Sequence, residues 1–176
     1  MGLTYLDLDE LTREYMLKEL SLDIEEKKVN LSSYFNETGK KIWLEKFSES
    51  VQKYDDEWLA IQLKQNGCFL DKKAFTTKNG NTSFRSVPYT AAETFAEGEF
   101  NRLYMRAICL RAQEGTGKVV IYRGKTVQNP RQGSESKIGS IVSANELLID
   151  LRNSLGSGTR LGIGEPNSGI SVKLSR

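Results

Sequence analysis

The stretch TAAETFAEGEFNRLYMRAICLR, residues 90–111, constrains the fold more than any other part of this chain. Apolar side chains recur in it at steps of three and four residues: Ala92, Phe95, Ala96, Phe100, Leu103, Ala107 and Leu110. Thr90 and Glu93 have the spacing of a capping box, in which each side chain satisfies a backbone N–H near the helix start. The pattern predicts a long helix that begins at Thr90 and forms the centre of a core.

Four further helices are predicted around this one. Asp9 is a candidate cap for a helix over about 10–27, with Leu11, Tyr15, Met16, Leu20 and Ile24 on its apolar side. A second helix covers about 40–54, and a third follows Asp55 or Asp56 and ends at Gly67. Ser143 and Glu146 form another capping box, before a helix that directs Leu147, Leu148, Leu151 and Leu155 inward.

The remaining segments predict strands. FTTKNGNTSF, with Asn79-Gly80 at its centre, is a strong hairpin signal within 68–88. A short strand is expected over 118–123, and residues 169–174 alternate in the manner of a terminal strand. The partner of this terminal strand is either 119–122 or the sheet edge of another subunit. The fold class is therefore α+β, mainly helical, with about five helices, a hairpin and a small sheet.

A chain of 176 residues is long enough for one domain with a substantial core. We expect a helical domain over 1–155, which includes the hairpin, and a glycine-rich arm with its strand over 156–176. The arm has glycine at positions 156, 158, 162, 164 and 169. The start of the chain is acidic, unlike a signal peptide, and no apolar run approaches about 20 residues. These features predict a soluble intracellular protein without membrane contact.

Histidine is absent, which excludes Ser-His-Asp and Cys-His catalysis and histidine-ligated zinc. The two cysteines, Cys68 and Cys109, cannot form a four-ligand metal site. Glu114–Lys118 resembles a phosphate loop, but a helix is expected before it and Val119 follows the lysine. We therefore expect no metal, no cofactor and no enzymatic activity.

The carboxylates Glu93, Glu97 and Asp150 are the candidates for acid–base or metal chemistry. Glu93 and Glu97 lie one helical turn apart, although acids are common in first turns because of the helix dipole. An enzyme would be favoured only if these carboxylates lined a pocket with shifted titration.

Charge is unevenly distributed along the chain. Residues 1–60 hold 14 acids against 8 bases, and residues 61–176 hold 9 acids against 17 bases. This pattern predicts either acid-to-base contact between copies or a basic surface that faces phosphate. The alternative is that folding brings the two halves together and cancels the polarity.

Two sets of residues are candidates for contact with partners. Arg123, Lys125, Arg131, Lys137 and Arg160 fall in loops near Tyr122, a composition suited to phosphate contact. The candidates for a protein interface are in the hairpin and the terminal strand: Lys78, Asn79, Gly80, Arg85, Ile170, Val172 and Leu174.

Three segments, VPYTAAETFAEGEFNRLYMRAICLRA (87–112), VVIYRGKTVQNPRQGSESKIG (119–139) and PNSGISVKL (166–174), resemble a largely uncharacterised family of small proteins from tailed phages and prophage-bearing bacteria. The resemblance covers about the last half of the chain and carries over no functional residue. It implies a virion structural protein, in the head, the neck or connector, or on the capsid, located in the virion or the host cytoplasm. Such a protein works by association with itself and with other virion proteins. The alternative is a small nucleic-acid-binding accessory protein that uses the basic loops.

Overall fold

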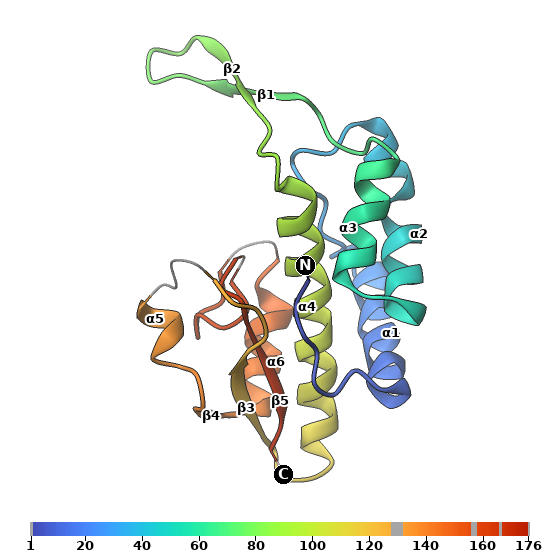
Figure 1. Ribbon diagram of the computed structural model, residues 1–176, viewed down its shortest axis with the longest axis vertical. Helices are drawn as coiled ribbons and strands as arrows, with labels where there is room; N and C mark the ends of the chain where they lie inside the picture. The colour runs from blue at the N-terminus through green and yellow to red at the C-terminus, as the bar shows by residue number, and fades with distance from the viewer. Residues whose placement is uncertain (1, 128–131, 156–157, 166, 176) are drawn as a thin grey trace.

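The computed structural model describes residues 2–127, 132–155, 158–165 and 167–175. Within these ranges it is a mainly helical α+β fold (Figure 1), as the sequence predicts. In chain order, its elements are α1 (Glu10–Glu25), α2 (Glu37–Lys53), α3 (Asp56–Gln65), β1 (Lys72–Thr76), β2 (Thr82–Ser86), α4 (Ala91–Gln113), β3 (Lys118–Arg123), α5 (Gln132–Glu135), β4 (Ile141–Ser143), α6 (Ala144–Asn153) and β5 (Ile170–Leu174). The single-turn α5 and the short β4 were not predicted.

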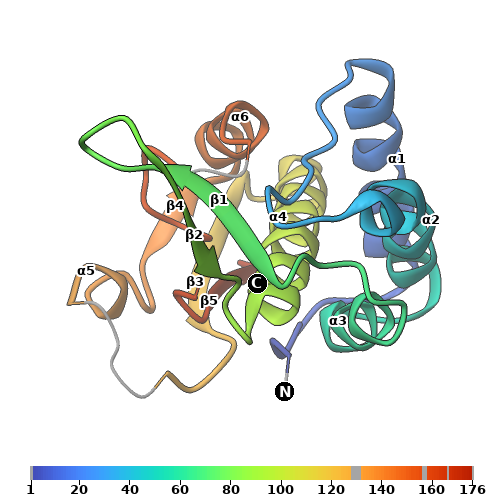
Figure 2. The same ribbon diagram turned by 90° about the horizontal axis from the view of Figure 1, so that it is seen from above.

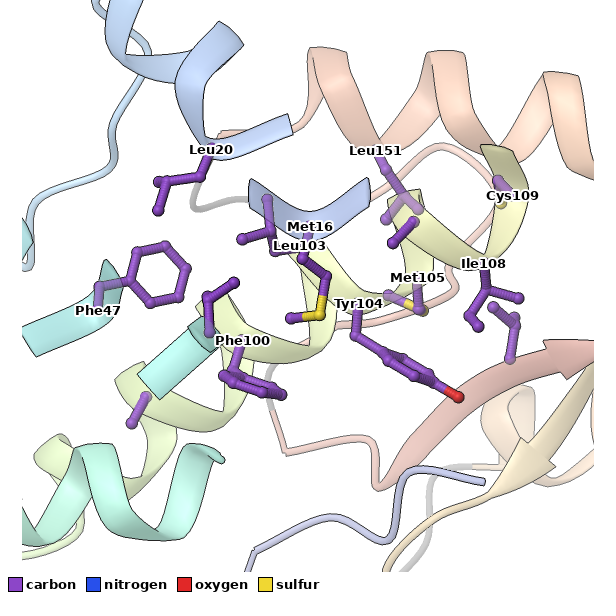
Figure 3. Close-up of a cluster of buried hydrophobic side chains, with 14 of the residues drawn as sticks. Met16, Leu20, Phe47, Phe100, Leu103, Tyr104, Met105, Ile108, Cys109 and Leu151 are labelled. Carbon is purple, nitrogen blue, oxygen red and sulfur yellow. The ribbon is translucent and has the colours of Figure 1, made fainter. Parts of the chain in front are cut away.

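Helix α4 forms the centre of the molecule, with α1, α2 and α3 on one side and α6 and the three-stranded sheet on the other (Figures 1 and 2). Sixteen of its 23 residues are buried, which is wider than the predicted apolar stripe. Figure 3 shows Leu20 and Phe47 pointing toward Phe100 and Leu103 of α4, while Leu151 approaches from α6. Because other elements cover α4 on both sides, burial is not limited to its apolar stripe. Its polar side chains on the other faces are therefore buried as well.

Helix starts follow the local signals with one exception. Asp9, Asp55 and Ser143 each accept a hydrogen bond from the N–H three residues later, as predicted. Asn36 does the same for α2, which therefore starts three residues before the predicted position. The capping box at Thr90 is wrong: α4 starts there, but the Thr90 side chain makes no cap hydrogen bond. Glu93 instead forms an ion pair with Lys64 of α3.

A buried cluster of charges joins α1 to α4 and α6. The Arg106 side chain is 0% exposed; its Nε donates to Glu19 at 2.6 Å and its Nη1 to Asp23 at 2.7 Å. Arg152 of α6 donates to the same Glu19 carboxylate at 3.0 Å. Arg102 pairs with Glu99 at 2.7 Å and lies 3.8 Å from Asp23. Acids from the first third of the chain thus neutralise arginines from the remainder.

This cluster also corrects the predicted face of α1. The helix turns Glu19 and Asp23 inward, together with Met16 and Leu20. Leu11 and Ile24, predicted on the apolar side, are exposed instead. Glu19 and Asp23 can be buried because Arg106 of α4 forms ion pairs with both. The sequence of α1 alone does not show where Arg106 lies.

The three-stranded sheet has the order β4-β3-β5 and is antiparallel throughout. Ile121 is opposite Val172, so the terminal strand pairs with 119–123 of its own chain and not with another subunit. Asn101 of α4 binds β5 through two hydrogen bonds. Its amide donates to the Ile170 carbonyl at 3.0 Å and accepts from the Ser171 hydroxyl at 2.6 Å. The alternative left open by the sequence is thereby resolved.

Residues 2–8, which we call the strap, form an extended segment that crosses the junction between α4 and the sheet. The Tyr122 hydroxyl donates to the Thr4 carbonyl at 2.7 Å, and the Tyr104 hydroxyl accepts from the Asp7 N–H at 3.1 Å. Asp7 also accepts from the Leu174 N–H at 3.0 Å. The strap therefore covers the edge of β5.

We predict that Arg106→Met lowers the free energy of unfolding by about 3 to 5 kcal/mol, because it leaves two buried carboxylates without their main cation. Lys40→Met is the matched control, since Lys40 forms an exposed pair with Glu37 that contributes less than about 1 kcal/mol. Urea unfolding of the two variants measures the difference. Equal losses would contradict the assigned role of the buried cluster.

Candidate functional site

The hairpin β1–β2 projects beyond the amino-terminal end of α4, away from the rest of the fold (Figure 1). Eight of its ten strand residues are exposed. Phe84 is 65% exposed and Phe75 is 38% exposed, although aromatic residues of this size are usually buried. An isolated two-stranded hairpin is only marginally stable in water, and most of this hairpin is exposed among the described residues.

The hairpin carries four of the residues predicted as interface candidates, three in its turn and Arg85 in β2. Lys78, Asn79 and Gly80 lie in the exposed turn, where Gly80 has a φ of +80° that a side chain would disfavour. Arg85 lies over the Phe75 ring at 5.7 Å, and Lys73 lies over the Tyr34 ring at 5.1 Å. The hairpin thus presents a mixed basic and aromatic surface.

The candidates in the terminal strand divide into two groups. Ile170 and Val172 are 0% exposed and belong to the protein's own core, so their side chains are not on the surface of the single chain. Both side chains belong to the core cluster, and β5 pairs with β3 of the same chain. Leu174 is half-buried and packs against the core, and it also lines an open groove beside the sheet.

This sheet groove has a volume of about 540 Å³ and is lined mainly by apolar side chains. Ile141 is 61% exposed and Leu6 is 52% exposed at its walls. The other lining residues are Asp7, Val120, Lys173, Leu174 and Ser175. Val120, Ile141 and Leu174 of this lining belong to β3, β4 and β5, which lie toward the end of the long axis opposite the hairpin (Figure 1).

Three of the basic loop residues form hydrogen bonds or ion pairs within their own chain. Arg123 donates to the Ser168 carbonyl at 3.1 Å and pairs with Glu135. Lys125 pairs with Glu97 at 2.6 Å, and Lys137 donates to the Gly162 carbonyl at 3.0 Å. Arg160 is exposed, and Arg131 lies outside the described residues. Three of the five therefore bind acceptors of their own chain.

The three candidate carboxylates have separate environments. Asp150 accepts from the N–H groups of Arg160 at 2.9 Å and Leu161 at 2.8 Å, which gives it a structural role in the loop after α6. Glu93 and Glu97 pair with Lys64 and Lys125. These two glutamates line a common pocket, as their helical spacing allows.

The pocket has a volume of about 160 Å³ and lies between the start of the chain, α3, α4 and Lys125. We call it the acidic pocket; its lining residues are Gly2, Asp56, Glu57, Ala60, Ile61, Lys64, Glu93, Glu97 and Lys125. Asp56 is 3% exposed, and its Oδ2 accepts from the Leu3 N–H at 3.2 Å. Among the described residues, Asp56 Oδ1 and the hydroxyl of neighbouring Tyr5 are both buried without a well-formed hydrogen bond.

Burial, together with the negative charges of Glu97 and Asp55, raises the pKa of Asp56 from 3.8 to about 6, although the hydrogen bond from the Leu3 N–H lowers it in part. By contrast, the pKa of Glu93 is lowered, because its bonds to Lys64 outweigh its burial. The pocket thus contains Glu93 and Glu97, which form ion pairs with lysines, and Asp56, for which no ion pair is seen among the described residues. Sequence reasoning assigned Asp56 only to a helix start, since its burial depends on the strap from Gly2 to Leu3.

Neither cysteine is suited to reactive chemistry. Both are buried and free, and burial raises the pKa of the Cys109 thiol to about 12. In the described ranges, no three His, Cys, Asp or Glu residues lie close enough together to hold a metal ion. Likewise, none of the helices in these ranges is long and apolar enough to cross a membrane.

Comparison of the chain with protein-family models, with curated proteins and with solved structures finds no match.

We predict that Asp56→Asn stabilises the protein at pH 7 by about 1 to 3 kcal/mol, since a pKa difference of one unit corresponds to about 1.4 kcal/mol. The folded state holds the Asp56 proton more tightly than the unfolded chain does. The contribution of this group to stability is therefore full below about pH 4 and is lost as the pH rises through about 6.

Urea unfolding between pH 4 and 7 measures this effect. Asp56→Asn should weaken the decline in stability between pH 4 and 6. Asp150→Asn is the matched control, and it should destabilise at pH 7 because one carboxylate oxygen that caps the loop is replaced by a donor. A loss of stability at pH 7 in Asp56→Asn as large as that in Asp150→Asn would refute the account of the pocket.

Proposed function

We propose that this protein is a non-enzymatic virion structural component that works by self-association. In this proposal the hairpin of one copy packs into the sheet groove of the next. The exposed hairpin carries the proposal, because Phe84 and Phe75 are 65% and 38% exposed in the part of the chain that the structure describes.

The two surfaces suit each other in chemistry and in position. The hairpin offers Phe84 on one face and Phe75 on the other, since they are opposite Ala74 and Ser83 in the register. The groove offers Leu6, Ile141 and Leu174. Burial of a side chain such as Phe84 contributes about 1.5 to 3 kcal/mol. Because the two surfaces lie at opposite ends of the molecule, the contact is head-to-tail, and such contacts either close into rings or continue as filaments.

The internal charge cluster supports an apolar contact over an acid-to-base one. Glu19 and Asp23 neutralise arginines of their own chain, so part of the charge polarity of the sequence is cancelled by folding. An apolar contact between copies persists in salt, whereas phosphate binding weakens steeply.

The resemblance to small phage proteins supports the assignment of this assembly to a virion, in the head, the neck or connector, or on the capsid. Other virion proteins are then the further partners, and the protein is located in the virion or the host cytoplasm. The alternative is nucleic-acid binding through basic residues. Lys72, Lys73, Lys78 and Arg85 on the hairpin now favour this alternative more than the loops do.

We predict that Phe84→Ser and Ile141→Ser each weaken self-association about 10- to 100-fold, as the loss of about 1.5 to 3 kcal/mol implies. Both side chains are exposed in the single chain, so the free energy of unfolding should change little. Light scattering measures the mass. Leu31→Ser, which removes an equally exposed apolar side chain between α1 and α2, should retain the wild-type mass.

A mixture of the two variants distinguishes a head-to-tail contact from other contacts. Phe84→Ser retains an intact groove, and Ile141→Ser retains an intact hairpin, so the mixture can form a single productive contact and should stop at a dimer. Wild-type mass that rises only when a DNA duplex is added at low salt would replace this proposal with the nucleic-acid alternative.

A further inference from the structure

The chain contains two Asn-Gly pairs, Asn66-Gly67 and Asn79-Gly80. Such a pair is chemically reactive, because glycine has no side chain that would keep the asparagine amide carbon away from the backbone nitrogen that follows it. That nitrogen can attack Cγ of the asparagine and close a five-membered ring. The fold gives the two pairs very different surroundings.

Asn66-Gly67, at the end of α3, is held by hydrogen bonds of its side chain and of its backbone. The Asn66 side chain donates to the Gln62 carbonyl at 2.8 Å. The Gly67 N–H donates to the Lys64 carbonyl at 2.9 Å, and the Gly67 carbonyl accepts from the Asn36 side chain at 2.7 Å. Ring closure at this pair therefore requires several bonds of the fold to break.

Asn79-Gly80 is in the exposed turn of the hairpin, which projects from the rest of the fold (Figure 1). Among the described residues, the Asn79 side chain forms no hydrogen bond. The Gly80 N–H donates to the Thr77 carbonyl at 3.0 Å, and this bond must open before the nitrogen can react. Opening it costs little, because a two-stranded hairpin is only marginally stable in water.

We propose that Asn79 is a site of spontaneous deamidation. The Gly80 nitrogen loses its proton to water or hydroxide and attacks Asn79 Cγ. A C–N bond forms, the bond from Cγ to Nδ2 breaks, and the amide nitrogen leaves as ammonia. A water molecule then opens the cyclic imide at one of its two carbonyl carbons, which gives either aspartate or isoaspartate. In isoaspartate the main chain continues through the side-chain carbons.

Both products change the surface that the hairpin presents. Each adds a carboxylate beside Lys78, in a segment, residues 72–86, whose other charged side chains are all basic. Isoaspartate also adds one carbon atom to the backbone of a turn in which the Thr77 N–H donates to the Asn81 carbonyl at 2.8 Å. The reaction needs only the single chain, so it is independent of the proposed self-association.

The test is incubation of the full chain in dilute solution at mildly alkaline pH, followed by tryptic digestion and mass spectrometry. Lys72 and Lys73 lie between the two pairs, so trypsin places them in separate peptides. We expect Asn79 to deamidate at least about tenfold faster than Asn66 in the native chain, since reaction at Asn66 must break additional hydrogen bonds. In concentrated urea, which unfolds the chain, the two pairs should react at similar rates.

Asn79→Gln is the matched control, because it keeps a neutral amide in the turn but would have to close a less favourable six-membered ring. A protein-isoaspartate methyltransferase should label the aged wild type and leave aged Asn79→Gln almost unlabelled. Equal rates at the two pairs in the native chain would overturn the proposal, as would equal labelling of the two aged proteins. Neither result depends on the light-scattering mass, so this proposal and the proposed function fail separately.

Discussion

The bonds from Arg106 to Glu19 and Asp23 are the interaction on which the rest of the structure depends. They orient α1 against α4, and Arg152 extends the same bonding to α6. A buried arginine is tolerated only when carboxylates surround it, so these three helices can pack in one arrangement. The cluster also decides what the surface presents. Several charges that are separated along the sequence meet inside the fold, and the basic and aromatic hairpin and the sheet groove are then the most distinctive exposed features.

The fold uses its polar groups unevenly. Around Arg106 each carboxylate has a cation, and around Asn101 the amide has both a donor and an acceptor. In the acidic pocket, however, Asp56 is buried with one oxygen that lacks a well-formed hydrogen bond among the described residues and with other carboxylates nearby. Such groups reduce stability. The hairpin has a similar unfavourable feature, because its two phenylalanines are exposed to water in the single chain.

Local signals in the sequence predicted local structure. The caps at Asp9, Asp55 and Ser143 and the turn at Asn79-Gly80 are formed within a few residues, so no distant partner is needed to recognise them. Predictions that depended on distant partners were less successful. The inward turn of Glu19 depends on α4, the burial of Ile170 depends on β3, and the engagement of Lys125 depends on Glu97. The acidic pocket was only partly foreseen, since the spacing of Glu93 and Glu97 was visible but their convergence with Asp56 was not.

Hydrogen exchange of the hairpin amides at increasing protein concentration tests the central claim most directly, because it reports on the proposed contact in the unmodified chain. The account predicts that amides of residues 72–86 exchange rapidly in dilute solution and become protected in step with the rise in mass. Amides of α4 should be protected at every concentration, since this helix is buried in the single chain. A rise in mass during which the hairpin continues to exchange rapidly would contradict the account.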